Sequence, residues 1–267
     1  MRTRREKDGG GQRYGFPLSG DYRLGTLMAL RGRLLAVEGR SAAGKTTLVR
    51  LASRTLGWMP LAEAYDRLDP PPPLEVGSPR ELLLLEEQLL AEEVRRYAEA
   101  RRACARGRTV LADTGFLGPV TYTRGLAALG RAPVSVVRAT ERKASGLFRQ
   151  QVLGIPDLSV YLETTVRERT RRARGDWPHR PAGLVERHEA VGEIERPFFT
   201  RAFPMAMPDR FRTLRGRPPP ASLVVSLRAL VAAAHPTPAP PDGGLELLAA
   251  LGPVTVARRT RNVGPNR

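Results

Sequence analysis

The chain has 267 residues, enough for one sizeable α/β core with tails but short for two full domains. Its formal net charge is +17, and arginine carries nearly all of the positive charge because only Lys7, Lys45 and Lys143 are lysines. The arginines are spread along the sequence rather than clustered, so a nucleic-acid partner is possible but not favoured.

Cysteine content and hydropathy limit the cellular compartments in which the protein is expected. The lone Cys104 excludes an intramolecular disulfide, and the apolar run at 222–234 is too short to span a membrane. The basic N-terminus lacks the apolar segment and cleavage site of a secretory signal. We therefore expect a cytoplasmic protein without a membrane partner, and a homodimer is possible.

Apolar periodicity divides the chain into tails and one domain. Residues 1–30 predict a disordered basic tail, 31–235 the folded domain, and 236–267 a Pro/Gly-rich linker with a basic C-terminal tail. In chain order, strands are predicted at 33–38, 59–64, 109–112, 158–162 and 211–214, and helices at 46–56, 79–106, 116–129, 164–174, 183–202 and 222–234. The alternation predicts an α/β fold with a mainly parallel five-stranded sheet flanked by helices in three layers.

The most specific motif lies between the first predicted strand and the first predicted helix. It matches GxxxxGK[ST], a glycine-rich loop whose backbone amides surround phosphate oxygens at a helix N-terminus. Lys45 is expected to reach the β and γ phosphates, and Thr46 to hold a metal ion, so ATP and Mg²⁺ are the predicted cofactors. The predicted nucleotide-binding residues are Gly39, Arg40, Ser41, Ala42, Ala43, Gly44, Lys45, Thr46 and Thr47.

Three segments carry a resemblance to a known group. LLAVEGRSAAGKTTLVRLAS resembles the first strand and P-loop of the thymidylate kinase and deoxynucleoside kinase group of P-loop proteins. VLADTGF resembles the third-strand segment of that group, and YLETTVRERTRRARGD resembles its fourth strand and arginine-bearing lid helix. The likeness covers about residues 33–234. It implies an ATP-dependent kinase whose acceptor is a nucleoside or a nucleoside monophosphate.

The same resemblance assigns roles to two carboxylates. Glu63 stands where the nucleoside kinases place the base that accepts the proton of the attacking hydroxyl, with Asp66 as an alternative. Asp113 ends the third predicted strand and is a candidate for Mg²⁺ coordination or for contact with the acceptor hydroxyl. Thr114 departs from the group, which has arginine there, and this leaves the identity of the acceptor open.

Arginines of the lid helix are candidates for stabilising the transferred phosphoryl group. Arg169, Arg171, Arg172 and Arg174 fall within two helical turns, so only one or two of them can face the phosphates. Arg169 and Arg174 are the predicted catalytic pair, beside Lys45.

In the resembled kinases the long helix at 79–106 lines the acceptor pocket, so the resemblance implies the same role here. Gln88 and Arg95 are seven residues apart on the long helix and therefore share a face. Tyr122 and Arg124 follow Asp113 on the next helix and are further candidates for acceptor binding.

Two other functions are compatible with the same phosphate-binding loop. A phosphotransferase that modifies antibiotics or other small alcohols would keep the fold and change the acceptor. A P-loop ATPase or nucleotide switch associated with nucleic acid would use the basic surface, although the sequence contains no recognisable NKxD motif. A chain that binds nucleotide without turnover is a further alternative.

Overall fold

The computed structural model describes residues 32–73, 76–176, 182–215 and 220–254. Within these residues, five strands form one sheet in the order β2-β3-β1-β4-β5, and every neighbouring pair is parallel. The predicted α/β fold class is confirmed. The strands are β1 (Leu34–Glu38), β2 (Met59–Leu61), β3 (Val110–Asp113), β4 (Leu158–Glu163) and β5 (Phe211–Arg215).

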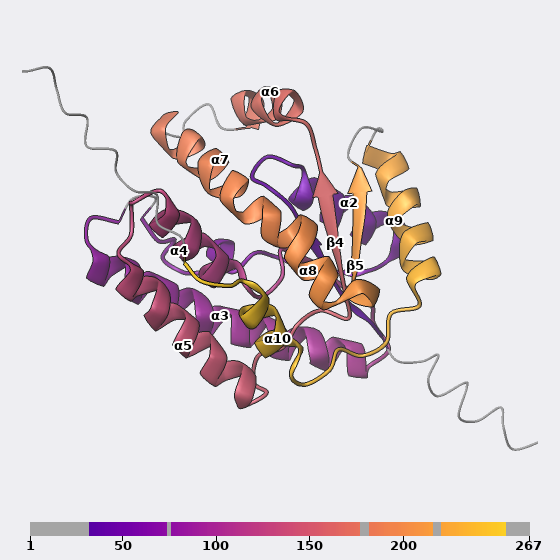
Figure 1. Cartoon of the computed structure of the whole chain (residues 1–267). Coiled ribbons are helices and arrows are strands. Elements are labelled where there is room, and N and C mark those ends of the chain that lie inside the picture. The colour runs from indigo at the N-terminus through magenta and orange to yellow at the C-terminus, as the bar shows by residue number, and fades with distance from the viewer. Residues whose placement is uncertain (1–31, 74–75, 177–181, 216–219, 255–267) are drawn as a thin grey trace, which may run out of the picture. The chain divides into compact units, whose positions relative to one another are not determined.

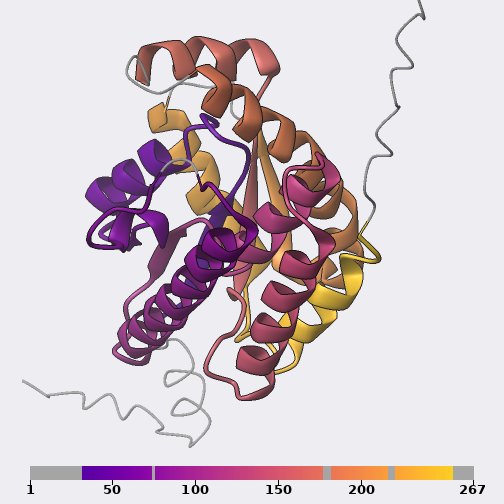
Figure 2. The same ribbon diagram turned by 90° about the vertical axis from the view of Figure 1, so that its left-hand side faces the viewer.

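Helices cover both faces of the sheet (Figures 1 and 2). Helices α2 and α9 pack on one face, whereas α3, α5, α8 and α10 pack on the other, with α4 and α7 beside them. The helices are α2 (Lys45–Leu56), α3 (Pro79–Ala105), α4 (Gly118–Ala128), α5 (Val134–Arg149), α6 (Val166–Asp176), α7 (Ala182–Pro197), α8 (Phe203–Ala206), α9 (Pro220–Ala234) and α10 (Gly243–Ala250). No helix in the described part of the chain combines the length and apolarity needed to cross a membrane.

The central strand β1 explains why the two cores form. Leu34 and Ala36 belong to one core and Leu35 and Val37 to the other, and all four side chains are fully buried. A strand covered on both faces reads as a continuous apolar run because alternate side chains point into opposite layers.

Two helices differ from the sequence analysis. Residues 134–149, for which no helix was predicted, form α5, whose buried residues lie on one face at helical spacing that the sequence analysis did not recognise. Residues 243–250, assigned to the linker and tail, form α10. A side chain on Gly244 would come within 2.1 Å of Phe148 on α5, so only glycine permits this close approach.

All carboxyl ends of the strands lie at one edge of the sheet because the strands are parallel. In Figure 1, the β4 and β5 arrows point toward α6, which lies beyond this edge. Ligands of open α/β sheets bind at the carboxyl edge, and the predicted phosphate loop leaves the sheet there.

Candidate functional site

The loop between β1 and α2 has the backbone of a phosphate-binding loop. Gly39, Ala42 and Gly44 have φ angles of 145°, 57° and 99°, and a side chain at Gly39 would approach the carbonyl oxygen of Leu162 to 2.9 Å. Lys45 donates from Nζ to the carbonyl oxygens of Gly39 at 3.0 Å and Arg40 at 3.3 Å. The loop therefore surrounds the ammonium group of Lys45 at the N-terminus of α2, which is the positive end of the helix dipole.

A cavity of about 710 Å³ opens from this loop. Residues 41–48 line it together with residues of α3, α4 and α7. Its volume lies in the range typical of small-molecule sites. The cavity therefore has a phosphate-binding part and room for another small molecule.

Several carboxyl groups line this cavity. Glu38, Glu63, Glu93 and Glu195 line the cavity, each from a different segment of the chain. Burial raises the pKa of Glu38, Glu93 and Glu195 to about 7 because the charged form loses hydration, whereas Lys45 acts in the opposite direction on Glu38 and Glu195. Groups with pKa values near 7 are suited to proton transfer at neutral pH.

Glu63 is among the predicted residues that the structure brings to the cavity. Strand β2 ends at Leu61, three residues before the predicted end, so Glu63 lies in the following loop and is partly exposed. Burial of its carboxyl group raises its pKa, and Lys45 opposes that shift. Asp66, the alternative base, is exposed at the same cavity.

Asp113 ends β3 as predicted and is buried, but it does not line the cavity; its carboxylate Oδ1 has no hydrogen-bond partner among the described residues. Thr114 has a φ of 66°, and this turn brings the backbone amide of Gly115 to 3.0 Å from Glu38 Oε1. A side chain on Gly115 would come within 2.3 Å of that oxygen. The turn at Thr114 and Gly115 therefore allows the Glu38 carboxylate to accept a hydrogen bond just beyond the end of β3.

Arg96 is a buried residue of this region that the sequence analysis missed. It comes from α3, pairs with Glu93, and donates from Nη2 to the carbonyl oxygens of Asp113 at 3.0 Å and Thr114 at 3.2 Å. The guanidinium group of Arg96 therefore lies beside Thr114. In the resembled kinases, an arginine occupies the position of Thr114. The available signal was its spacing, since Arg96 continues the apolar row of Leu82 and Leu89 at intervals of seven.

Gln88 and Arg95 require a correction. Both are exposed, neither lines the cavity, and Arg95 pairs instead with Glu92 at 2.9 Å. The inward face of α3 carries Glu86 and Glu93, and a helix turns about 200° over two residues, so Gln88 and Arg95 point away from it.

Of the two candidate residues on α4, only one lines the cavity. Tyr122 lines the cavity, and its ring lies 5.7 Å from the ring of His188 on α7. Arg124 pairs with Glu141 on α5 and donates to the carbonyl oxygens of Leu251 at 2.9 Å and Gly252 at 2.6 Å. Arg124 therefore joins α4 to neighbouring segments and does not face the cavity.

The lid arginines are distributed differently from the prediction. Arg169 is buried, pairs with Glu189 and does not line the cavity. Arg172 lines the cavity and donates to the carbonyl oxygen of Ala43. Arg171 is exposed, and the side chain of Arg174 lies outside the described residues.

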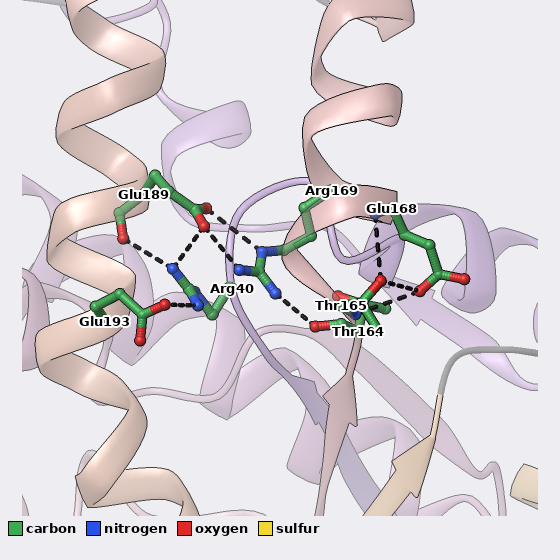
Figure 3. Close-up of polar contacts among 7 residues, drawn as sticks. All are labelled: Arg40, Thr164, Thr165, Glu168, Arg169, Glu189 and Glu193. Atoms are coloured by element: carbon green, nitrogen blue, oxygen red, sulfur yellow. Dashed lines mark hydrogen bonds and ion pairs between the residues drawn. The ribbon is translucent and has the colours of Figure 1, made fainter.

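Figure 3 shows how the phosphate loop is joined to α6 and α7. Arg40 Nη2 lies 2.6 Å from Glu189 Oε1, and Arg169 Nη2 lies 2.7 Å from the same oxygen. Arg40 also pairs with Glu193. The side chain of Arg40 therefore points out of the loop toward α7, which leaves its backbone as the part available to a nucleotide. We call these four residues the P-loop clasp.

The fold and the loop together define a class, the three-layer α/β fold with a P-loop after the central strand. Solved structures of the same fold include deoxyadenosine kinase from M. mycoides with bound dATP, with a TM-score of 0.57 and 14% sequence identity over 74% of this chain and 99% of that one. The same kinase with products dCMP and a flexible dCDP bound gives a TM-score of 0.56 and 13% identity over 74% and 98%. No protein-family model matches the chain, and no curated protein matches it in sequence.

Proposed function

We propose that this chain transfers the γ-phosphoryl group of ATP to a hydroxyl group of a nucleoside. One observation carries the proposal: a single cavity is lined by the phosphate loop around Lys45 and by residues of α3, α4 and α7. The deoxyadenosine kinases that share the fold support the same class of acceptor.

The charges of the cavity favour a hydroxyl acceptor over a nucleoside monophosphate. The lining carries more acidic than basic residues, namely Glu38, Glu63, Asp66, Glu86, Glu93 and Glu195 against Lys45, Arg131, Arg172 and Arg187. An incoming phosphate would be repelled by these carboxyl groups, whereas a neutral hydroxyl would not.

Three side chains have suitable positions for the transfer. Glu63 would accept the proton of the attacking hydroxyl. Lys45 and Arg172, which both line the cavity, would hold the charge of the transferred group. Arg172 takes the role first expected for Arg169 and Arg174.

Magnesium fits this arrangement if the nucleotide completes its coordination. No group of three or more His, Cys, Asp or Glu side chains among the described residues could hold a metal ion. Thr46 lines the cavity, and Asp113, which lies behind the lining, has a buried oxygen that no described residue bonds. These two residues would hold the ion together with phosphate oxygens and water. When bound, Mg²⁺ would neutralise charge on the transferring phosphates.

An amine-bearing alcohol, as in antibiotic phosphotransferases, is the second candidate acceptor. The carboxyl groups that disfavour a phosphate would attract ammonium groups of such a compound. The assay below includes both acceptor classes.

ADP release in the presence of ATP and Mg²⁺ tests the proposal. We expect release to depend on added nucleoside, and Lys45→Ala to reduce turnover by at least about 100-fold because the ammonium group is lost. The control Lys143→Ala, on α5 and outside the cavity, should retain activity. Unchanged turnover in Lys45→Ala, or release that requires DNA or RNA, would contradict the proposal.

A further inference from the structure

Arg96 is a buried cation that lies behind the wall of the cavity. The residue is fully buried on α3 and does not line the cavity, so it cannot contact a substrate bound there. Its Nη1 pairs with the carboxylate of Glu93, and its Nη2 donates to the carbonyl oxygens of Asp113 at 3.0 Å and Thr114 at 3.2 Å. Glu93 and Thr114 both line the cavity. Arg96 therefore joins two parts of the cavity wall that come from different elements.

The turn that Arg96 contacts has an unfavourable backbone conformation. Thr114 has a φ of 66°, in the left-handed region that β-branched residues rarely adopt. A residue keeps such a conformation only where surrounding contacts fix it. Two consecutive carbonyl oxygens of the turn accept bonds from one guanidinium nitrogen of Arg96, and Arg96 Cζ lies 5.3 Å from the centroid of the Phe116 ring. The guanidinium group thus contacts the turn at both of its ends.

The conformation of this turn also sets the position of Glu38. The Gly115 amide donates to Glu38 Oε1 at 3.0 Å, and Glu38 lines the cavity. A buried guanidinium group that bonds a carboxylate on one side and two carbonyl oxygens on the other has a fixed orientation. If the turn moved, Thr114 and Glu38 would move together in the cavity wall.

We propose that Arg96 is a positioning residue for the phosphoryl transfer, because it holds the turn at 113–115 in a fixed relation to Glu93. The chain has Thr114 where the resembled kinases have arginine, and Arg96 supplies a guanidinium group to the same turn from α3. Arg96 acts through Glu38, Glu93 and Thr114, and not by contact with ATP or the acceptor. The inference rests on the proposed function, because the groups that it positions line the site of the proposed transfer.

Arg96→Met removes the bonds to the turn and keeps a side chain of similar length. We expect kcat to fall by at least about tenfold, because a small displacement of reacting groups is costly in rate. The Kd for ATP should change by less than about twofold, since the bonds of Arg96 go to α3 and to the turn after β3. Steady-state kinetics and calorimetry measure the two quantities. The control Arg102→Met, exposed on the same helix and outside the cavity lining, should keep the wild-type values.

Hydrogen exchange of the Gly115 amide reports on the turn without any turnover. In Arg96→Met this amide should exchange at least about tenfold faster relative to the amides of β1, which report opening of the whole sheet. A loss of overall stability would change both rates alike. Arg96→Lys keeps a positive charge beside Glu93 but has one nitrogen for three partners, so intermediate values of kcat and exchange are expected. Arg96→Lys gives the test if Arg96→Met does not fold.

A substitution in the turn tests whether Arg96 acts through it. Asparagine adopts the left-handed region more readily than threonine, so Thr114→Asn lowers the strain that Arg96 opposes. The fold reduction of kcat by Arg96→Lys should therefore be at least about threefold smaller in the Thr114→Asn background than in the wild type. Independent sites would give equal reductions, and that result would overturn the inference.

The remaining outcomes separate this inference from the proposed transfer. Nucleoside-dependent turnover with the same kcat in the wild type and the folded Arg96 variants would overturn the role of Arg96 and leave the transfer intact. Faster exchange at Gly115 in a protein without nucleoside-dependent turnover would support the hold on the turn and count against the transfer. Unchanged relative exchange at Gly115 in the variants would overturn the inference, whether or not the protein turns over.

Discussion

At the scale of single residues, the carboxyl groups around Lys45 differ in environment. Glu38 accepts a backbone hydrogen bond from Gly115, and Glu93 is paired with Arg96. Glu63 lies in a loop at the cavity and is partly exposed. A base must be able to reach the acceptor hydroxyl. The carboxyl groups of Glu38 and Glu93 are instead bonded to other groups of the protein. This comparison favours Glu63 as the base.

Glu63→Gln should reduce kcat by about 100- to 10,000-fold and leave the Kd for ATP nearly unchanged, because it removes a proton acceptor and not a phosphate contact. Steady-state kinetics and calorimetry measure the two quantities. Asp66→Asn is the matched comparison at the same cavity and should have a smaller effect. A larger loss in Asp66→Asn would make Asp66 the base, and an equal loss of ATP affinity in Glu63→Gln would make Glu63 a structural residue.

At the scale of elements, the P-loop clasp connects three segments that are far apart in sequence. Arg40 belongs to the phosphate loop, Arg169 to α6, and Glu189 and Glu193 to α7 (Figure 3). The N-terminus of α6 is held by a reciprocal pair of bonds, in which Thr165 Oγ1 and the Glu168 carboxylate each accept the other residue's backbone amide at 3.3 Å. Helix α7 also lines the cavity with His188, so the clasp joins the phosphate loop to another part of the cavity wall.

Glu189→Gln should therefore weaken ATP binding as well as stability. The variant removes the negative charge shared by two buried guanidinium groups, and we expect a loss of about 1–3 kcal/mol in the free energy of unfolding and a several-fold higher Kd for ATP. Urea denaturation and calorimetry check the two effects. Glu186→Gln, exposed on the same helix, is the control. If stability falls while ATP affinity is retained, the clasp supports the fold without supporting the loop.

At the scale of the whole molecule, the C-terminal helix α10 completes the core on the α5 face of the sheet. Leu247 is fully buried there, and Gly243 and Gly244 pack against Ile155 and Phe148. Helix α10 lies far from the phosphate loop in sequence, and its residues do not line the cavity. Its contribution should appear in stability and not in substrate binding.

Leu247→Ala should lower the free energy of unfolding by about 2–5 kcal/mol, because it leaves a cavity in a closely packed core. Urea denaturation measures the loss. The control Glu246→Ala changes an exposed neighbour and should have little effect. Nucleotide affinity should be unchanged in the folded Leu247→Ala protein, and a loss of stability below about 0.5 kcal/mol would contradict the assigned packing.

Much of the fold was predictable because its signals are local. The five strands, the phosphate loop and most helices follow from apolar periodicity and from glycine and lysine at fixed spacing. Helix α5 was missed although its buried residues follow the helical period, and α10 was missed because proline and glycine before it resemble a linker. Neither helix is decided by propensity alone, since each depends on the surface against which it packs.

The sequence by itself determined the α/β class, the order of strands and helices along the chain, and the loop that would hold a triphosphate. Only the tertiary structure decided which side chains meet around that loop. Arg40 and Glu193 are 153 positions apart, and Arg172 and Ala43 are 129 apart, so no local pattern predicts either contact. The same is true of the cavity as a whole, because its lining depends on how α3, α4 and α7 pack around the phosphate loop.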